Sequence, residues 1–217
     1  TLFTSNQKIL KEVNKVFNFL EVSYKIKKYK HLIVSPHYTT NIISKLIDNE
    51  IQNHKNGLSS GISLKLNNVT NYPLVDKLYE ASQAGVKIKM IVRGICCLVP
   101  GKKGLSENIT VVSVVDKFLE HPRVLIFENA GDKKIYLSSA DFMTRNIENR
   151  VEVACPIYDK ELQKQILDTF NLSWNDNIKA RIVNQNPQNK MVKPKSYMTE
   201  QRSQWTTYDY FKNKLNL

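Results

Sequence analysis

Apolar and polar residues alternate along this chain with two different periods, and each period predicts a type of element. Apolar residues three and four positions apart predict amphipathic helices, whereas strict alternation or a short apolar run predicts a strand. We expect helices, several of them bounded by capping residues, glycine or proline, at residues 4–20, 39–57, 72–85 and 159–174. We expect strands at residues 31–36, 61–67, 86–92, 109–115, 123–129, 133–139 and 151–157.

Shorter signals refine this pattern. Residues Thr4 to Gln7 read as a capping box, and Asp159 reads as the N-cap of the helix that follows it. The segment 116–120 predicts a short helical piece, and residues 130–132 predict a tight turn between two strands. Residues 184–204 are polar and aperiodic, which predicts a surface segment, and residues 206–215 are expected to form a last helix that docks back.

Strands that alternate with helices predict an α/β fold in which helices cover both faces of a parallel or mixed sheet. The 217 residues and the 41% hydrophobic content are sufficient for a substantial core. No apolar run approaches the roughly 18 residues of a membrane helix. The first residues lack both a signal-peptide pattern and an initiator methionine, so we expect the chain to be cut from a longer protein.

The chain is strongly basic, with 32 Lys and Arg against 20 Asp and Glu and a net charge of +12. Such a surplus indicates a polyanionic partner, namely nucleic acid, anionic lipid or a phosphate-rich substrate. The alternative is a soluble basic protein without such a partner. The cysteines Cys96, Cys97 and Cys155 are odd in number and show no CxxC spacing, which argues against a disulfide framework or zinc site. We expect each to be a small core residue in a reducing cytoplasm.

Polar residues gather at or near the ends of the predicted strands, where open α/β sheets bind ligands. They are Lys65, Asn67, Arg93, His121, Arg123, Ser138, Ser139, Asp141, Arg145, Asn146 and Arg150. Arginine offers a planar fork that matches two phosphate oxygens, and lysine supplies a point charge. An isolated surface cation is usually only solvated, but Arg93 lies between the apolar runs "KMIV" and "GICCLV" and therefore needs a partner or a ligand.

His121 admits two interpretations, a satisfied structural histidine or a catalytic one. The order His121-Pro122-Arg123, then a strand, then "SSAD" resembles one half of a phospholipase-D-type site. In that superfamily one histidine attacks phosphorus, and a facing histidine moves the proton of the leaving group. This sequence departs from that pattern at Arg123, where lysine is usual, and at Asp141, where asparagine is usual.

Longer segments resemble the C-terminal part of bacterial polyphosphate kinase, a family built on phospholipase-D-like domains. They are residues 61–101, residues 114–157 and the tetrapeptide "IKAR", and the resemblance covers most of residues 1–185. The resemblance implies a phospholipase-D-like mixed sheet flanked by helices on both faces. It also implies reversible transfer of the terminal phosphoryl group of ATP to inorganic polyphosphate through a phosphohistidine.

The resemblance also assigns roles to single residues. His121 matches the family's proton-transferring histidine, and Arg93 matches its nucleotide-contacting arginine. The remaining matches, with phosphate contacts expected, are Lys65, Asn67, Arg123, Arg145 and Arg150. Mg²⁺ is a family expectation, but we place no metal ligand on this chain. His31, His37 and His54 lack the sequence that follows the nucleophilic histidine, so we expect that residue before Thr1 and expect this chain alone to be inactive.

We therefore expect residues 1–28 to be a helix from the end of a preceding catalytic domain and residues 29–185 to be a phospholipase-D-like catalytic domain. Residues 186–217 are then a polar tail with a terminal helix. The expected partners are ATP, ADP, polyphosphate and upstream domains of the same polypeptide, in the cytoplasm or peripherally at the inner membrane; homo-oligomerisation is left open. No nucleic acid is expected. The alternatives are a polyanion- or nucleic-acid-binding module without its own catalysis and a purely structural or dimerisation domain.

Overall fold

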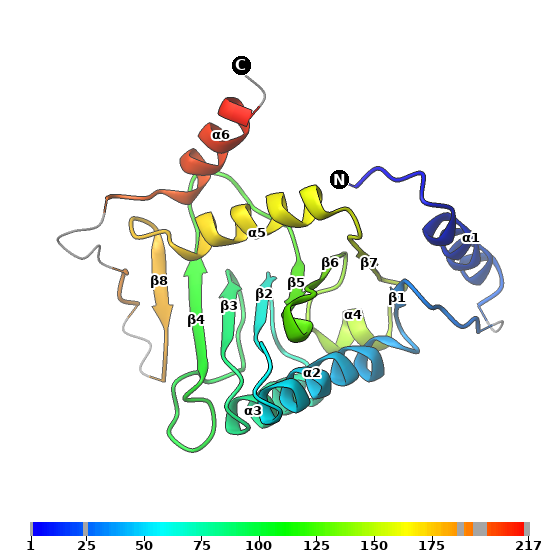
Figure 1. The fold of residues 1–217 in the computed structure, drawn as a ribbon, viewed down its shortest axis with the longest axis horizontal. Coiled ribbons are helices and arrows are strands. Elements are labelled where there is room, and N and C mark those ends of the chain that lie inside the picture. Colours follow the sequence, from blue (N-terminus) through cyan, green and yellow to red (C-terminus); the bar gives the residue numbers. More distant parts are fainter. Residues whose placement is uncertain (1, 24–25, 186–188, 193–198, 215–217) are drawn as a thin grey trace.

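A single mixed β-sheet runs through the chain in this computed structural model, which describes residues 2–23, 26–185, 189–192 and 199–214 (Figure 1). Its strand order is β1-β7-β6-β5-β2-β3-β4-β8. Strands β2, β3 and β4 are parallel, and every other pairing is antiparallel. The strands are β1 Ile33–Val34, β2 Ile62–Leu66, β3 Ile88–Val92, β4 Ile109–Val114, β5 Val124–Phe127, β6 Lys134–Ser138, β7 Val153–Pro156 and β8 Ala180–Val183.

Helices cover both faces of this sheet. The helices are α1 Gln7–Glu21, α2 Thr39–Lys55, α3 Tyr72–Gln83, α4 Thr144–Glu148, α5 Lys160–Trp174 and α6 Ser203–Lys214. Side chains of α2 and α3 pack in one core with Leu64 and Met90 of the sheet. On the other face, Phe170 of α5 packs in a second core with Ile91 and Ile126. The fold predicted from the sequence is thereby confirmed.

Helix α1 packs against the β1 edge, on the side of the sheet that does not face α2. Ile9 and Val16 form a small core with Leu32 and Val34. Glu12 is buried there and accepts hydrogen bonds from the backbone N–H groups of residues 30–32. Burial raises the pKa of Glu12, but these donors outweigh burial and the pKa lies below its usual value.

Several local predictions differ from the structure. Asn6, rather than Thr4, caps α1 by accepting from the N–H groups of Lys8 and Ile9. Residues 116–120 form no helix because, as shown below, their polar groups bond to the C-terminal segment. The sequence analysis missed the short helix α4 and the edge strand β8. Helix α6 does dock on α5, with the Tyr210 hydroxyl donating to Asp168 at 2.9 Å.

The cysteine prediction needs one correction, because Cys97 is exposed while Cys96 and Cys155 are half-buried. Burial raises the pKa of the Cys96 thiol to about 11 and also raises that of Cys155. Of the helices in the described ranges, none combines the length and the apolar character needed to cross a bilayer. The predicted tail lies partly outside the described residues, which include only 189–192 and 199–214 of it.

The topology brings six chain segments to one edge of the sheet. The carboxyl ends of the parallel strands β2, β3 and β4 lie at this edge. Because β5 is antiparallel to β2, and β7 to β6, the same edge holds the start of β5, the end of β6 and the start of β7. The polar residues that the sequence places at these strand ends therefore share one rim of the molecule.

Candidate active site

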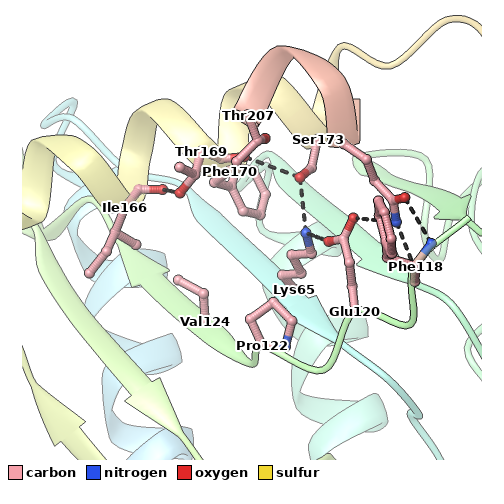
Figure 2. Close-up of a pocket in the computed structure, with 11 residues that line it drawn as sticks. Lys65, Phe118, Glu120, Pro122, Val124, Ile166, Thr169, Phe170, Ser173 and Thr207 are labelled. Carbon is pink, nitrogen blue, oxygen red and sulfur yellow. Dashed lines mark hydrogen bonds and ion pairs between the residues drawn. The ribbon is translucent and has the colours of Figure 1, made fainter. Parts of the chain in front are cut away.

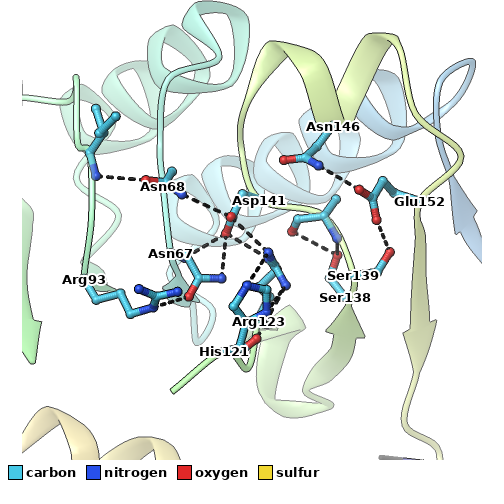
Figure 3. A network of polar contacts seen from close by, with 12 residues as sticks. Asn67, Asn68, Arg93, His121, Arg123, Ser138, Ser139, Asp141, Asn146 and Glu152 are labelled. Carbon is cyan, nitrogen blue, oxygen red and sulfur yellow. Dashed lines mark hydrogen bonds and ion pairs between the residues drawn. The ribbon is translucent and has the colours of Figure 1, made fainter. Parts of the chain in front are cut away.

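The buried carboxylate of Asp141 organises this rim (Figure 3). It lies in the turn after β6 and is 3% exposed. Its Oδ1 accepts from the backbone N–H of Asn67 at 2.7 Å, and its Oδ2 accepts from Asn68 Nδ2 at 3.4 Å. Burial by itself raises the pKa of Asp141, but the bonds from Arg123 and Asn67 outweigh it and hold the pKa below its usual range. Asp141 is thus an ionised anchor rather than a proton donor.

Arg123 joins this anchor to His121. The Arg123 Nε lies 2.9 Å from Asp141 Oδ1, and NH2 donates to Oδ2 at 3.1 Å. Its NH1 lies 2.9 Å from Nδ1 of His121. Its NH2 lies 3.5 Å from Nε2 of the same ring, so the guanidinium faces both imidazole nitrogens. The His121 residue is exposed on the rim, where a bound substrate can approach the ring.

Arg93 approaches the same network from the end of β3. Its Nε donates to Asn67 Oδ1 at 2.5 Å, and Asn67 Nδ2 points on to Asp141 at 3.3 Å. Within the described ranges no carboxylate comes into ion-pair distance of Arg93. The guanidinium is half-exposed, so it presents an uncompensated positive charge at the rim. Such a charge suits a phosphate ligand.

Gly94 permits the close approach of β3 to β2 at this point. A Cβ at Gly94 would lie 2.6 Å from Asn68 Oδ1 and 2.8 Å from Asn67 O. The Gly94 N–H donates to that Asn67 carbonyl at 2.8 Å. The absence of a side chain at Gly94 therefore sets the distance between Arg93 and the asparagines of β2.

Lys65 does not join the network, although the sequence analysis grouped it with Asn67. Lys65 belongs to β2 and points toward α5 (Figure 2), whereas Asn67 lies in the bend after β2, where the alternation of the strand no longer applies. Its Nζ contacts Glu120 Oε2 at 2.5 Å and Ser173 Oγ at 2.9 Å. Its charge is therefore already paired inside the protein.

Arg145 and Arg150 also stay outside the Asp141 network. Both are exposed, on α4 and just after it, and Arg150 NH1 lies 4.0 Å from Glu152 Oε1. Glu152 instead binds Asn146 Nδ2 at 2.7 Å and the hydroxyl of Ser139. These contacts fix the loop between β6 and β7 beside the site (Figure 3).

Sequence reasoning missed Asn68, Gly94 and Glu152. Each is a polar residue or glycine at a strand end, so position alone could have suggested them. Their roles depend on partners such as Asp141, which is 73 positions away from Asn68 in the chain.

The described residues of this rim offer no preformed set of magnesium ligands. Over the part of the chain that the structure describes, no group of three or more His, Cys, Asp or Glu side chains could hold a metal ion. Asp141 is the carboxylate at the centre of the network, and both of its oxygens are already bound by cationic or amide donors. A hard cation needs such oxygens free.

The fold and the rim define a class, the phospholipase-D-like α/β domains. The crystal structure of Nuc, a phospholipase D family member from Salmonella typhimurium, matches 70% of this chain and 96% of its own with a TM-score of 0.52. At 17% sequence identity this match shows the fold alone. The family model "Polyphosphate kinase C-terminal domain 2" matches residues 32–204. The chain belongs to the polyphosphate kinase family and corresponds to this C-terminal domain.

Relatives agree with this assignment over nearly the whole chain. The polyphosphate kinase of Vibrio parahaemolyticus is 48% identical over 98% of the chain, and that of Escherichia coli K12 is 46% identical over 98%. The crystal structure of the Porphyromonas gingivalis polyphosphate kinase matches 97% of the chain with a TM-score of 0.91 and 39% identity. The chain spans only 30% and 31% of the lengths of the two sequences and 32% of the crystallised chain.

Proposed function

We propose that this chain is the C-terminal catalytic part of a polyphosphate kinase. The enzyme reversibly transfers the terminal phosphoryl group of ATP to inorganic polyphosphate, through a phosphohistidine in a domain that precedes this one. The proposal is carried by one observation: the exposed imidazole of His121 is oriented by Arg123, which is itself fixed by the buried Asp141. An imidazole that is both exposed and oriented in this way can act as a positioned general acid or base.

In the proposed reaction the upstream imidazole nitrogen attacks the γ-phosphorus of ATP. The new N–P bond forms as the bond from phosphorus to the β,γ-bridging oxygen breaks, and ADP leaves. His121, in its imidazolium form, donates a proton to the departing oxygen and becomes the neutral imidazole. In the second half-reaction a terminal oxygen of polyphosphate attacks the phosphorus of the phosphohistidine and gives its proton to neutral His121, while the N–P bond breaks and frees the upstream imidazole. Proton transfer of this type contributes roughly 10²–10⁴-fold to rate.

Arg93 acts on charge rather than on protons in this proposal. Phosphoryl transfer depends mainly on positioning and on neutralising the equatorial oxygens. The half-exposed guanidinium of Arg93 is fixed by Asn67, so it needs little reorganisation to bind phosphate oxygens. Arg145 and Arg150, which are exposed beside the rim, are assigned weaker contacts with a longer polyphosphate chain.

Labelling with ATP tests the proposal. The full-length protein, incubated with γ-labelled ATP and Mg²⁺, should yield labelled polyphosphate and an acid-labile phosphoprotein. The isolated chain of residues 1–217 should yield neither, because its histidines are not the nucleophile. A robust phosphohistidine on the isolated chain would contradict this assignment.

The rival function is polyanion or nucleic-acid binding without catalysis, for which the net charge of +12 is the supporting observation. Competition between polyphosphate and DNA for the full-length protein, at one fixed salt concentration, separates the two because both interactions depend on salt. Preference for polyphosphate is expected. Equal or stronger binding of DNA would favour the rival.

A further inference from the structure

The segment that carries His121 is held by the C-terminal part of the chain. Residues 115–122, here called the His121 loop, connect β4 to β5 without regular structure. Asp116 lies at the start of this loop and is contacted by two guanidinium nitrogens of Arg202, at 2.8 and 2.7 Å. The loop is therefore tied down at a point five positions before the imidazole.

The amide of Gln204 forms a second and closer attachment. Its Oε1 accepts from the Phe118 N–H at 3.0 Å, while its Nε2 donates to the Phe118 carbonyl at 2.8 Å. The side chain thus pairs with the loop backbone as a neighbouring strand would. The same Nε2 also donates to Glu120 Oε1 at 3.1 Å. Gln204 therefore binds the two residues that lie three and one positions before His121.

Glu120 is also held by a lysine of β2. Its second carboxylate oxygen accepts from Lys65 Nζ at 2.5 Å, and Lys65 in turn binds Ser173 of α5 (Figure 2). With Glu120 directed toward α5, His121 is directed to the rim beside Arg123, as Figure 3 shows.

Packing alone does not hold the loop in this position. A cavity of about 330 Å³ lies between the loop, α5 and α6, lined by apolar groups such as Phe118, Pro122 and Phe170 (Figure 2). Leu119 is 79% exposed and Phe118 is 56% exposed. With free volume on one side and solvent on the other, the polar contacts of Gln204, Lys65 and Arg202 hold the loop, and the Phe118 ring adds an edge-on contact with Trp205.

We propose that Gln204 is a positioning residue for His121, acting with Lys65 through Phe118 and Glu120. The inference rests on the proposed role of His121. The C-terminal helix is then part of the catalytic apparatus, although none of its residues touches substrate. Its contribution is to keep the imidazole within reach of the departing oxygen, because misplacement by about 1 Å can cost roughly 100-fold in rate.

A comparison of full-length variants tests the proposal. Gln204→Met retains the side-chain volume and removes every hydrogen bond that the side chain of residue 204 makes to the His121 loop. It should lower kcat for polyphosphate synthesis by about 10- to 100-fold and leave the KM for ATP within about twofold, since binding by Arg93 is unaffected. Hydrogen exchange should increase in residues 115–122 in this variant. Gln201→Met is the matched control, because Gln201 donates to Leu172 of α5 and makes no bond to the loop.

The double variant His121→Ala/Gln204→Met tests the positioning role of Gln204 separately from the proposed function of His121. If Gln204 acts through His121, Gln204→Met should add no further loss to His121→Ala, whose residual rate is measured in long incubations. The positioning role would be overturned if the losses of kcat from Gln204→Met and His121→Ala multiplied in the double variant. It would also be overturned if Gln204→Met left hydrogen exchange in residues 115–122 unchanged, or if Gln201→Met lowered kcat equally. A near-normal rate for His121→Ala alone would instead overturn the function of His121 itself, and the positioning role with it.

Discussion

At the scale of single residues, the site depends on a buried ion pair. Arg123 and Asp141 have side chains that are only 12% and 4% exposed, and every oxygen of the carboxylate has a donor. The residue types and their strand-end positions were visible in the sequence. The pairing was not, because it depends on how β2, β5 and β6 come together in the sheet.

Substitution of Asp141 by Asn should destabilise the chain strongly. The change leaves the Arg123 guanidinium buried beside a neutral amide, and loss of one partner of a buried ion pair costs about 3–5 kcal/mol. Denaturant unfolding measures the free energy difference. The control is Asp132→Asn, which removes a highly exposed carboxylate from Lys160 and should change stability little. Equal effects of the two substitutions would contradict the anchoring role of Asp141.

At the scale of elements, the sequence predicted the long helices and the central strands well, because each has a clear period and a buried face. It failed where tertiary contacts decide the local structure. Residues 116–120 have a helical pattern, yet their polar groups bond to Arg202 and Gln204. Strand β8 is a short strand at one end of the strand order, paired with β4 and bridged through Arg181 to Met191, and its apolar pattern is weak.

The close approach of β2 and β3 gives a prediction at this scale. Gly94→Ala would place a methyl group 2.8 Å from the Asn67 carbonyl, so the strand ends must separate. We expect a loss of about 1–3 kcal/mol in the free energy of unfolding, together with reduced synthetic activity of the full-length protein. Gly61→Ala, at the other end of β2, would place its methyl group 3.2 Å from the Glu128 side chain and at an ordinary contact distance of 3.6 Å from the Lys87 carbonyl, so it should cost less. Thermal unfolding of the Gly94→Ala and Gly61→Ala variants, each against the unsubstituted chain, measures the two losses of stability.

The attachment of α6 gives a prediction about pH. Asp176 is fully buried and accepts backbone N–H groups at the start of α6 and β8, including Ser203 at 2.7 Å and Lys179 at 2.6 Å. Burial raises its pKa, but these donors outweigh burial and the pKa is lowered in the folded state. Its stabilising contribution is therefore complete above the unfolded-state pKa of about 3.9 and is lost as pH falls through the lower folded-state value.

Asp176→Asn should accordingly be less stable at pH 7 and should lose less stability on acidification than the unsubstituted chain. Unfolding free energies measured from pH 7 down to pH 3 test both expectations. Parallel curves, with a constant difference throughout that range, would show that folding does not lower the pKa of Asp176 and would contradict this account.

At the scale of the whole molecule, the chain places one histidine and its cationic surroundings on a single rim of a phospholipase-D-like sheet. The chain spans about 30% of its relatives, so the proposed reaction requires residues that lie in the remainder of those longer proteins. The fold and the gathering of Arg93, His121 and Arg123 were predictable from strand ends and from family resemblance. The separation of Lys65 from Asn67 was not predictable from strand alternation, which places residues two positions apart on one face; it arises because the chain bends at Asn67, after the end of β2.

The most direct measurement is the rate of polyphosphate synthesis by full-length protein carrying His121→Ala, with folding verified by circular dichroism and thermal unfolding. Because His121 is exposed, its removal should leave the fold intact. The account predicts a fall of roughly 10²-fold or more, the contribution typical of positioned acid–base catalysis. A correctly folded variant that synthesises polyphosphate at a near-normal rate would contradict it.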